Sequence, residues 1–174
     1  MAGGLLIEAE WVLYQREKDY PGSVVAAFDW RHTLQNTARP AFFSLDTGSA
    51  WPHDTFYLGW RPWFPVLFYE QGFKKDVFVL RIGNLSAPQF LDFFRFKDPR
   101  TSFSGGPFTG PVNINPFAPP GFGIQFDLRP LKDNELYFTG LVHDQNARIE
   151  VYSWNEFFTK GDLYYGLEIG YFWR

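Results

Sequence analysis

The chain has 174 residues and a mass of 20.3 kDa, which is the length of one domain, and 45% of its residues are hydrophobic. That content argues against disorder, and a net charge of -3 gives no general attraction to nucleic acid. The chain contains no cysteine, which excludes a disulfide scaffold, a thiolate metal site and a cysteine nucleophile.

Aromatic residues make up 21% of the chain, and 16 Gly and 13 Pro interrupt it throughout, a composition that favours strands over helices. No stretch of about 18 uninterrupted apolar residues occurs, so the sequence contains no candidate transmembrane helix. The first residues lack the basic, apolar and small-residue regions of a secretory signal. We therefore expect that the chain either stays inside the cell or lacks its natural N-terminus.

The N-terminal third predicts a hairpin. In residues 6–16 the apolar side chains, such as Ile7 and Trp11, alternate with Glu8, Glu10 and the hydroxyl of Tyr14. Residues 23–32 repeat this alternation and form the second strand. Residues 33–65 are predicted to be mainly loop, because four prolines remove ladder donors, with a short strand at 55–61.

Residues 66–71 and 76–85 predict the next hairpin. In its second strand, Arg81 lies on the other side from Phe78, Leu80 and Ile82, which is the polar side. Residues 86–120 form a long loop rich in Pro, Gly and Phe, and its start, 88–96, is predicted to be a short helix entered through Ser86. Phenylalanines 90, 93, 94 and 96 are too many for a solvated loop, so we expect them to pin the loop by packing rather than to form a stacking surface.

The C-terminal third shows the strongest alternation. Residues 122–129 and 136–143 form another hairpin, and the last strand, from residue 163 onward, places Glu168 on the polar side. The pattern continues up to residue 174.

Two architectures explain such two-faced strands. A soluble sandwich buries the aromatic face as its core. A membrane barrel instead places aromatic residues at strand ends, a uniformly large apolar face outside and isolated charges with Gly inside. The strand-end aromatics are Trp11, Trp30, Tyr57, Trp60, Tyr137, Tyr171 and Trp173. At roughly 20 residues per strand and turn, the chain supplies about six to eight strands.

Three ordered segments resemble the carbohydrate-selective porin family of OprB type: LFYEQGF at 67–73, VLRIGNLS at 79–86 and FLDFFRFKDPRTSF at 90–103. The resemblance continues through 121–140, 154–158 and 167–171, so it covers about 66–174, and 1–35 fit more loosely. Gly83-Asn84-Leu85 replaces the family's more usual Gly-Lys-Leu, and neither a signal peptide nor a terminal aromatic strand is present. These departures suggest a fragment.

The resemblance implies an all-β protein: an antiparallel transmembrane barrel of about sixteen strands, of which this chain is one domain-sized part. It further implies a cell outer membrane location, contact with outer-membrane lipid, an oligomer that is often a homotrimer, and passive diffusion of monosaccharides and similar small sugars through a charged constriction. The 86–120 loop is the candidate constriction. No cofactor, metal or nucleic acid belongs to this interpretation.

A sugar passage needs hydrogen-bonding groups beside aromatic surface. Alternation places Glu70, Arg81 and Glu168 on the polar face, and these are the first pore-lining candidates. Asp92, Arg95 and Arg100 lie in the loop that can fold inward and complete the set. For each of the six, a solvated charge or a structural salt bridge is the plainer explanation.

No catalytic function is predicted, because acidic pairs such as Glu8 and Glu10 are common and the three histidines lack metal-ligand spacing. The main alternative is a soluble β-sandwich or β-barrel that binds a sugar or an apolar ligand. A small eight-strand outer-membrane barrel with a structural role is a third hypothesis.

Overall fold

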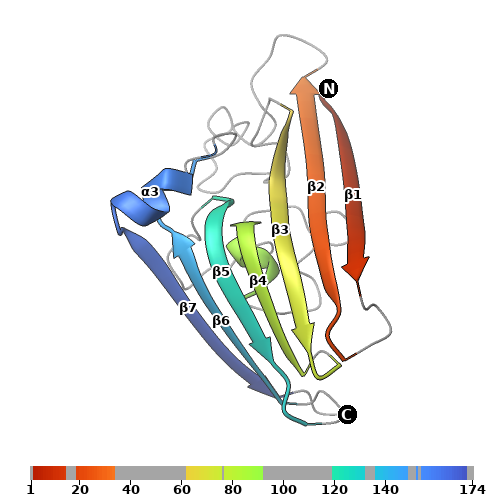
Figure 1. The fold of residues 1–174 in the computed structure, drawn as a ribbon. Coiled ribbons are helices and arrows are strands. Elements are labelled where there is room, and N and C mark those ends of the chain that lie inside the picture. Colours follow the sequence, from red (N-terminus) through yellow and green to blue (C-terminus); the bar gives the residue numbers. More distant parts are fainter. Residues whose placement is uncertain are drawn as a thin grey trace.

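The protein is all-β in a computed structural model that describes residues 2–14, 19–33, 62–75, 77–91, 119–131, 136–148, 152 and 154–171. Seven antiparallel strands form one open sheet in chain order, each strand pairing with the next (Figure 1). They are β1 (Ala2–Tyr14), β2 (Gly22–Thr33), β3 (Trp63–Phe73), β4 (Phe78–Leu85), β5 (Gly121–Leu128), β6 (Leu136–Asp144) and β7 (Leu163–Tyr171). Helical structure in the described residues is limited to the 3-10 turn η3 (Ala87–Gln89) and the helix α3 (Trp154–Thr159).

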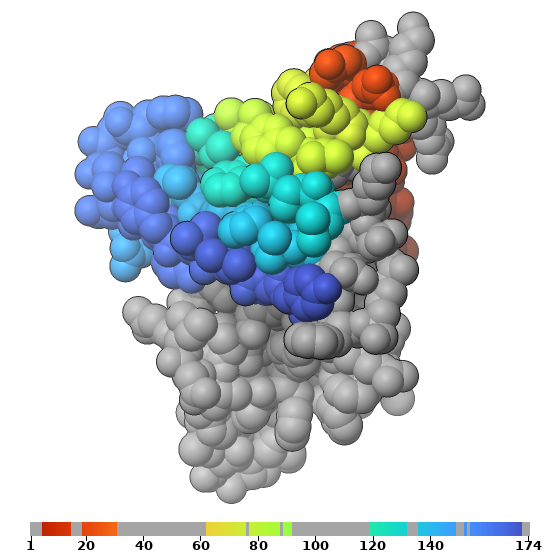
Figure 2. All heavy atoms as spheres, turned by 90° about the horizontal axis from the view of Figure 1, so that it is seen from below, coloured from red at the N-terminus to blue at the C-terminus, as the bar shows by residue number. Residues whose placement is uncertain are grey.

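The connections between strands differ strongly at the two ends of the sheet. Residues 15–21, 74–77 and 129–135 join strands at one end, and the longer segments 34–62, 86–120 and 145–162 join them at the other. At the short end neighbouring turns touch, because the Arg129 amide donates to the Val77 carbonyl at 2.8 Å. Figure 2 looks onto this end and shows the two turns side by side in yellow-green and cyan.

The two faces of the sheet reverse the arrangement that is usual for a protein in water. On one face Gln125 and Thr139 are 0% and 1% exposed, whereas on the other Trp11 is 72% and Leu167 is 70% exposed. The first is called the polar face and carries Ser23, Glu70, Arg81, Gln125, Asp127, Thr139 and His143. The second is called the apolar face and carries Ile7, Trp11, Ile82, Ile124, Phe126, Tyr165, Leu167 and Ile169.

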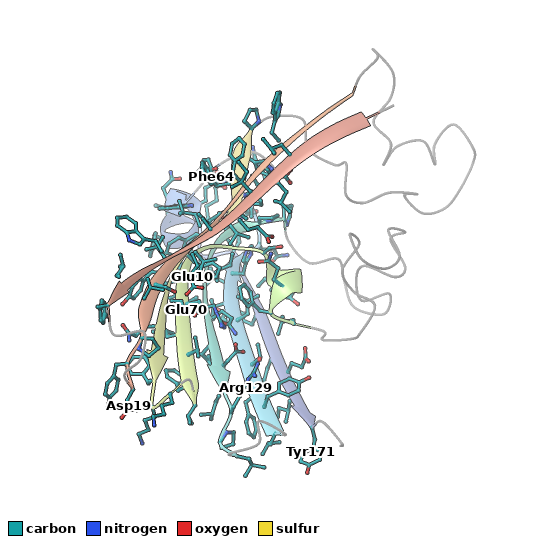
Figure 3. All side chains as sticks on the ribbon, turned by 90° about the vertical axis from the view of Figure 1, so that its right-hand side faces the viewer. Glu10, Asp19, Phe64, Glu70, Arg129 and Tyr171 are labelled. Carbon is teal, nitrogen blue, oxygen red and sulfur yellow. The ribbon has the colours of Figure 1, made fainter. Side chains whose placement is uncertain are left out.

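A small apolar core lies on the polar face beside these polar groups. It joins side chains from β2, β3, β4 and β6 to the segment that leaves β4, and η3 stands off this side of the sheet (Figure 3). Its members are Ala27, Val66, Phe68, Leu85, Ala87, Phe90, Leu91 and Leu141. The start of the 86–120 segment therefore packs on the polar face through Phe90, as expected for that phenylalanine; phenylalanines 93, 94 and 96 lie outside the described residues.

The predicted strands are found with shifted ends. The strand expected at 66–71 begins at Trp63 and contains Pro65, and the β2–β3 ladder skips from Ala27–Val66 to Asp29–Trp63 at that point. Proline cannot donate to a ladder, and an irregularity in pairing accommodates it. The Phe64 amide instead donates to the Tyr152 hydroxyl at 2.6 Å. The strand expected at 55–61 lies outside the described residues.

Three local expectations differ from the structure. Tyr14 shares the apolar face with Tyr69, to which it hydrogen-bonds at 2.7 Å, because the β1–β2 register shifts between Val12 and Tyr14. The helix expected over 88–96 is a three-residue 3-10 turn within the described part, and the Ser86 side chain does not cap it. The helix α3 was not predicted; its Phe157 and Phe158 pack around Phe122 on the apolar face.

Gly83 is the position where the sheet least tolerates a side chain. Its φ is 142°, and a Cβ there would lie 2.5 Å from the Leu67 carbonyl oxygen and 2.7 Å from the Phe68 Cα. We expect Gly83→Ala to lower the free energy of unfolding by about 1–3 kcal/mol or more, because backbone atoms cannot move aside. Gly161→Ala is the control, since Gly161 has φ 69° and a Cβ built there meets no heavy atom within 4 Å beyond its chain neighbours. For this control we expect a loss of about 1 kcal/mol in unfolding free energy. Denaturant unfolding followed by tryptophan fluorescence measures both, and equal losses would contradict the analysis.

Candidate functional site

A row of ladder partners crosses all seven strands on the polar face and forms the centre of the candidate site. The pairs run from Val12 to Ser23, Glu70, Arg81, Gln125, Leu141 and Gly166. This set is called the Arg81 row. Side chains that are directly opposite each other in a ladder lie within interaction distance, so an Arg between Glu and Gln is placed to bond both.

Arg81 binds three neighbours at once. Its Nε donates to Glu70 Oε2 at 2.5 Å, and its Nη1 donates to Gln125 Oε1 at 2.7 Å and to Asp127 Oδ2 at 2.5 Å. The side chains of Arg81, Glu70 and Asp127 are 15%, 29% and 12% exposed. A charge so far removed from water must be paired, and the guanidinium with its five donors is suited to joining two carboxylates.

The Arg81 network continues toward β6. Gln125 Nε2 donates to Asp127 Oδ1 at 2.7 Å, and the Thr139 hydroxyl donates to the same oxygen at 2.6 Å. Both oxygens of Asp127 are therefore bonded, which is needed for a carboxylate at this depth. One cation and two carboxylates leave the Arg81 network with a formal charge of minus one.

Two further polar contacts lie on the same face. The Tyr137 hydroxyl donates to Glu168 Oε1 at 2.6 Å. The fully buried His143 ring has Nδ1 2.8 Å from the Asp144 carbonyl oxygen and Nε2 3.1 Å from the Leu85 carbonyl oxygen. His143 thereby ties the end of β4, where the 86–120 segment begins, to β6.

The structure brings together only part of the predicted site. Glu70 and Arg81 lie side by side in direct contact, and Glu168 lies on the same face but bonds Tyr137 instead. The other candidates, Asp92, Arg95 and Arg100, lie outside the described residues.

Sequence reasoning missed Gln125, Asp127 and Thr139 as members of the site. Alternation placed Gln125 and Asp127 on the polar side, but nothing local identified Arg81 as their partner across β4 and β5. A signal was present in the ladder itself: once the β4–β5 register is known, Arg81 is opposite Gln125 and within one diagonal step of Asp127.

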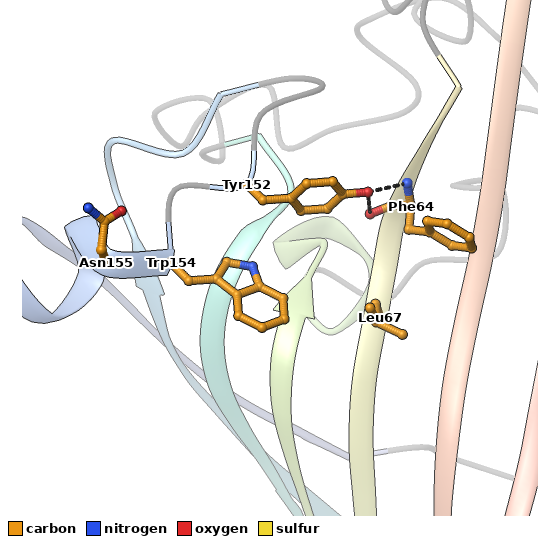
Figure 4. Close-up of a pocket in the computed structure, with 5 residues that line it drawn as sticks. All are labelled: Phe64, Leu67, Tyr152, Trp154 and Asn155. Carbon is orange, nitrogen blue, oxygen red and sulfur yellow. Dashed lines mark hydrogen bonds between the residues drawn. The ribbon is translucent and has the colours of Figure 1, made fainter.

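A hollow of about 480 Å³ lies on the apolar face near the end with the long connections (Figure 4). Phe64 and Leu67 of β3 form one side, and Tyr152, Trp154 and Asn155 form the other. The Tyr152 hydroxyl reaches across to the backbone of Phe64. This hollow is almost wholly apolar, so it fits hydrocarbon better than a polar solute.

Within the described ranges, no three His, Asp or Glu side chains gather to hold a metal ion. Across the same ranges no helix is long and apolar enough to span a membrane. The polar face offers hydrogen bonds and paired charges.

Removing Arg81 should destabilise the protein far more than removing one of its partners. Arg81→Gln leaves Glu70 and Asp127 without their shared cation, and we expect a loss of about 3 kcal/mol in unfolding free energy. Glu70→Gln is the matched control, because Arg81 keeps Asp127, and about 1 kcal/mol is expected. Adding Asp127→Asn to Arg81→Gln should recover part of the loss in denaturant unfolding. Equal costs for the two single changes would rule out the proposed bridging role.

Comparison of the chain with protein-family models, with curated proteins and with solved structures finds no match. The function has to be argued from the sheet, its reversed faces and the Arg81 row.

Proposed function

We propose that the protein forms part of an outer-membrane channel for the passive diffusion of small carbohydrates. The observation that carries this proposal is the reversal of the sheet: paired charges and amides are buried, while Trp11, Tyr165 and Leu167 are open. Water penalises such a surface, whereas the hydrocarbon of a bilayer accommodates it.

Aromatic side chains at the two ends of the sheet support a bilayer position. Tyr14, Tyr20 and Tyr171 lie near the short connections, and Trp30, Tyr152, Trp154 and Phe158 lie near the long ones, all exposed. Tyrosine and tryptophan favour the interface between hydrocarbon and water. Short connections at one end and long ones at the other also agree with outer-membrane barrels.

A channel requires that further strands complete the wall. Among the strands that the structure describes, β1 and β7 each have one ladder neighbour and, as the arrows in Figure 1 show, run in the same direction. Closing an antiparallel barrel therefore needs an odd number of additional strands between them. The resemblance to the OprB-type family suggests a wall of about sixteen strands and a possible homotrimer in the outer membrane.

Carbohydrate is the preferred solute because the polar face offers donors and acceptors together. The partly exposed Arg81 can supply N–H groups, and the partly exposed Glu70 can supply carboxylate oxygens that accept from sugar hydroxyls. The Arg81 network has only a small net charge, so it attracts neither anions nor cations strongly. The resemblance to carbohydrate-selective porins points to the same solute class.

The competing function is a soluble β-sandwich or barrel that binds an apolar ligand. The hollow between Phe64 and Trp154 favours it, because such a hollow on a core-facing surface is a binding pocket. That function requires the apolar face to be covered by protein. The two functions therefore differ in whether Trp11 contacts lipid or is covered by protein.

Quenching by brominated lipid separates these functions. In vesicles with brominated acyl chains, we expect strong quenching of tryptophan fluorescence, to which the open Trp11 contributes. Trp11→Phe should reduce the quenched fraction, and Trp63→Phe should not, because Trp63 is buried near the polar face. No quenching in any variant would favour the soluble protein.

Sugar passage is a separate test. Liposomes carrying the protein should admit glucose faster than protein-free liposomes and should still exclude dextran. The rate should rise linearly with external glucose, without saturation at low concentration, as diffusion requires. Glucose entry no faster than in protein-free liposomes would falsify the channel proposal, even if the lipid quenching is observed.

A further inference from the structure

The segment that leaves β4 lies against the Arg81 row. Gln89 donates from its amide to the Ser86 carbonyl at 2.9 Å, and the amides of Phe90 and Leu91 donate to the Ala87 carbonyl at 3.1 and 3.2 Å. These bonds close a compact turn directly after the buried Leu85. The turn projects two buried apolar side chains, Phe90 and Leu91, onto the polar face; the pair is called the wedge.

Phe90 contacts the Arg81 side of the row. The guanidinium carbon of Arg81 lies 5.2 Å from the centre of the Phe90 ring, a cation-π distance. The same ring packs edge-to-face with Phe68 of β3, with ring centres 5.9 Å apart. Phe90 is therefore fixed by β3 and in turn limits where the guanidinium can lie.

Leu91 reaches the other end of the same row. Its Cδ1 lies 2.3 Å from the position that a Cβ on Gly166 would take, and its Cγ lies 3.5 Å from that position. Gly166 is the β7 member of the Arg81 row and Leu141, in the same apolar core, is its partner on β6. The glycine leaves the room that Leu91 fills, so the wedge spans the row from β4 to β7.

We propose that the wedge sets the free width of the polar face and that Phe90 is a positioning residue for Arg81. The wedge covers the part of the row that lacks polar side chains, Leu141 and Gly166, and confines the Arg81 guanidinium to the part beside Glu70. A solute passing along the polar face then meets hydrogen-bonding groups at one fixed width. This inference rests on the proposed channel and adds the residues that determine its size selectivity.

Size selectivity is measured as the ratio of glucose to raffinose entry into liposomes. Leu91→Ala removes the contact with Gly166 and should lower this ratio by more than about twofold, because the larger sugar gains most from a wider passage. Leu91→Met, which conserves volume, should keep the ratio. Leu80→Ala is the matched control, since Leu80 lies on the apolar face of β4 and its loss should leave the ratio unchanged. Mere damage to folding lowers both rates together and does not change the ratio.

A cross-link tests the contact without relying on transport. The natural chain has no cysteine, so Leu91→Cys with Gly166→Cys introduces the sole thiol pair. Leu91 Cγ, the position nearest to that of a cysteine Sγ, lies 3.5 Å from a Cβ built on Gly166, so oxidation with copper phenanthroline should join the two thiols and remove both from maleimide labelling. Each single variant is the control and should stay labelled. The oxidised double variant should keep the wild-type sugar ratio.

The outcomes separate the possible failures. Thiols that stay free under oxidation would show that Leu91 does not lie at Gly166, and would overturn the wedge while leaving the channel intact. If the cross-link forms but Leu91→Ala leaves the ratio of glucose to raffinose entry unchanged, the wedge contributes only packing. That result would overturn its role in selectivity. Absence of glucose entry with the natural chain would overturn the channel, and the wedge's role in selectivity with it.

Discussion

The double ion pair of Arg81 is the interaction on which the rest of the sheet depends. Glu70, Arg81 and Asp127 belong to three successive strands, and each charge is held well away from water. A slip of one residue between β4 and β5 would put Gln125 and Asp127 on the opposite face from Arg81 and leave Asp127 without its cation. Hydrophobic alternation alone specifies a face, whereas this network specifies one register on that face.

The network also explains how one sheet face can hold charges and an apolar core together. Thr139 and Gln125 complete the bonds of Asp127, so the polar groups satisfy one another and need little water. The core around Leu85 can then lie directly beside these bonded groups. Phe90 belongs to both parts, since its ring touches Phe68 on one side and the Arg81 guanidinium on the other.

Local alternation predicted the seven described strands and their faces well, because a period of two is written into each strand separately. It placed Glu70 and Arg81 correctly on one side, and their contact follows from the tight β3–β4 turn. The contact of Leu91 with Gly166 could not be predicted, since it joins residues far apart in sequence and depends on the whole sheet. Tyr14 lies on the other face from the one expected, because a single register irregularity between Val12 and Tyr14 reverses the alternation. No local residue pattern predicts this irregularity. The short α3 has too few residues for a helical period to be recognised.

For the proposed passage, the completeness of the Arg81 network matters as much as its composition. A solute that moves by diffusion must bind strongly enough to enter and weakly enough to leave. Donors that are already bonded within the protein, such as those of Arg81 and Gln125, gain little by exchanging a carboxylate for a sugar hydroxyl. In the proposed channel, contacts with sugar would therefore be weak and replaceable, while the paired charges would keep the wall rigid. If the donors and acceptors of the Arg81 network were unpaired, they would bind the solute for longer. Their side chains would also lose the fixed geometry that selectivity requires.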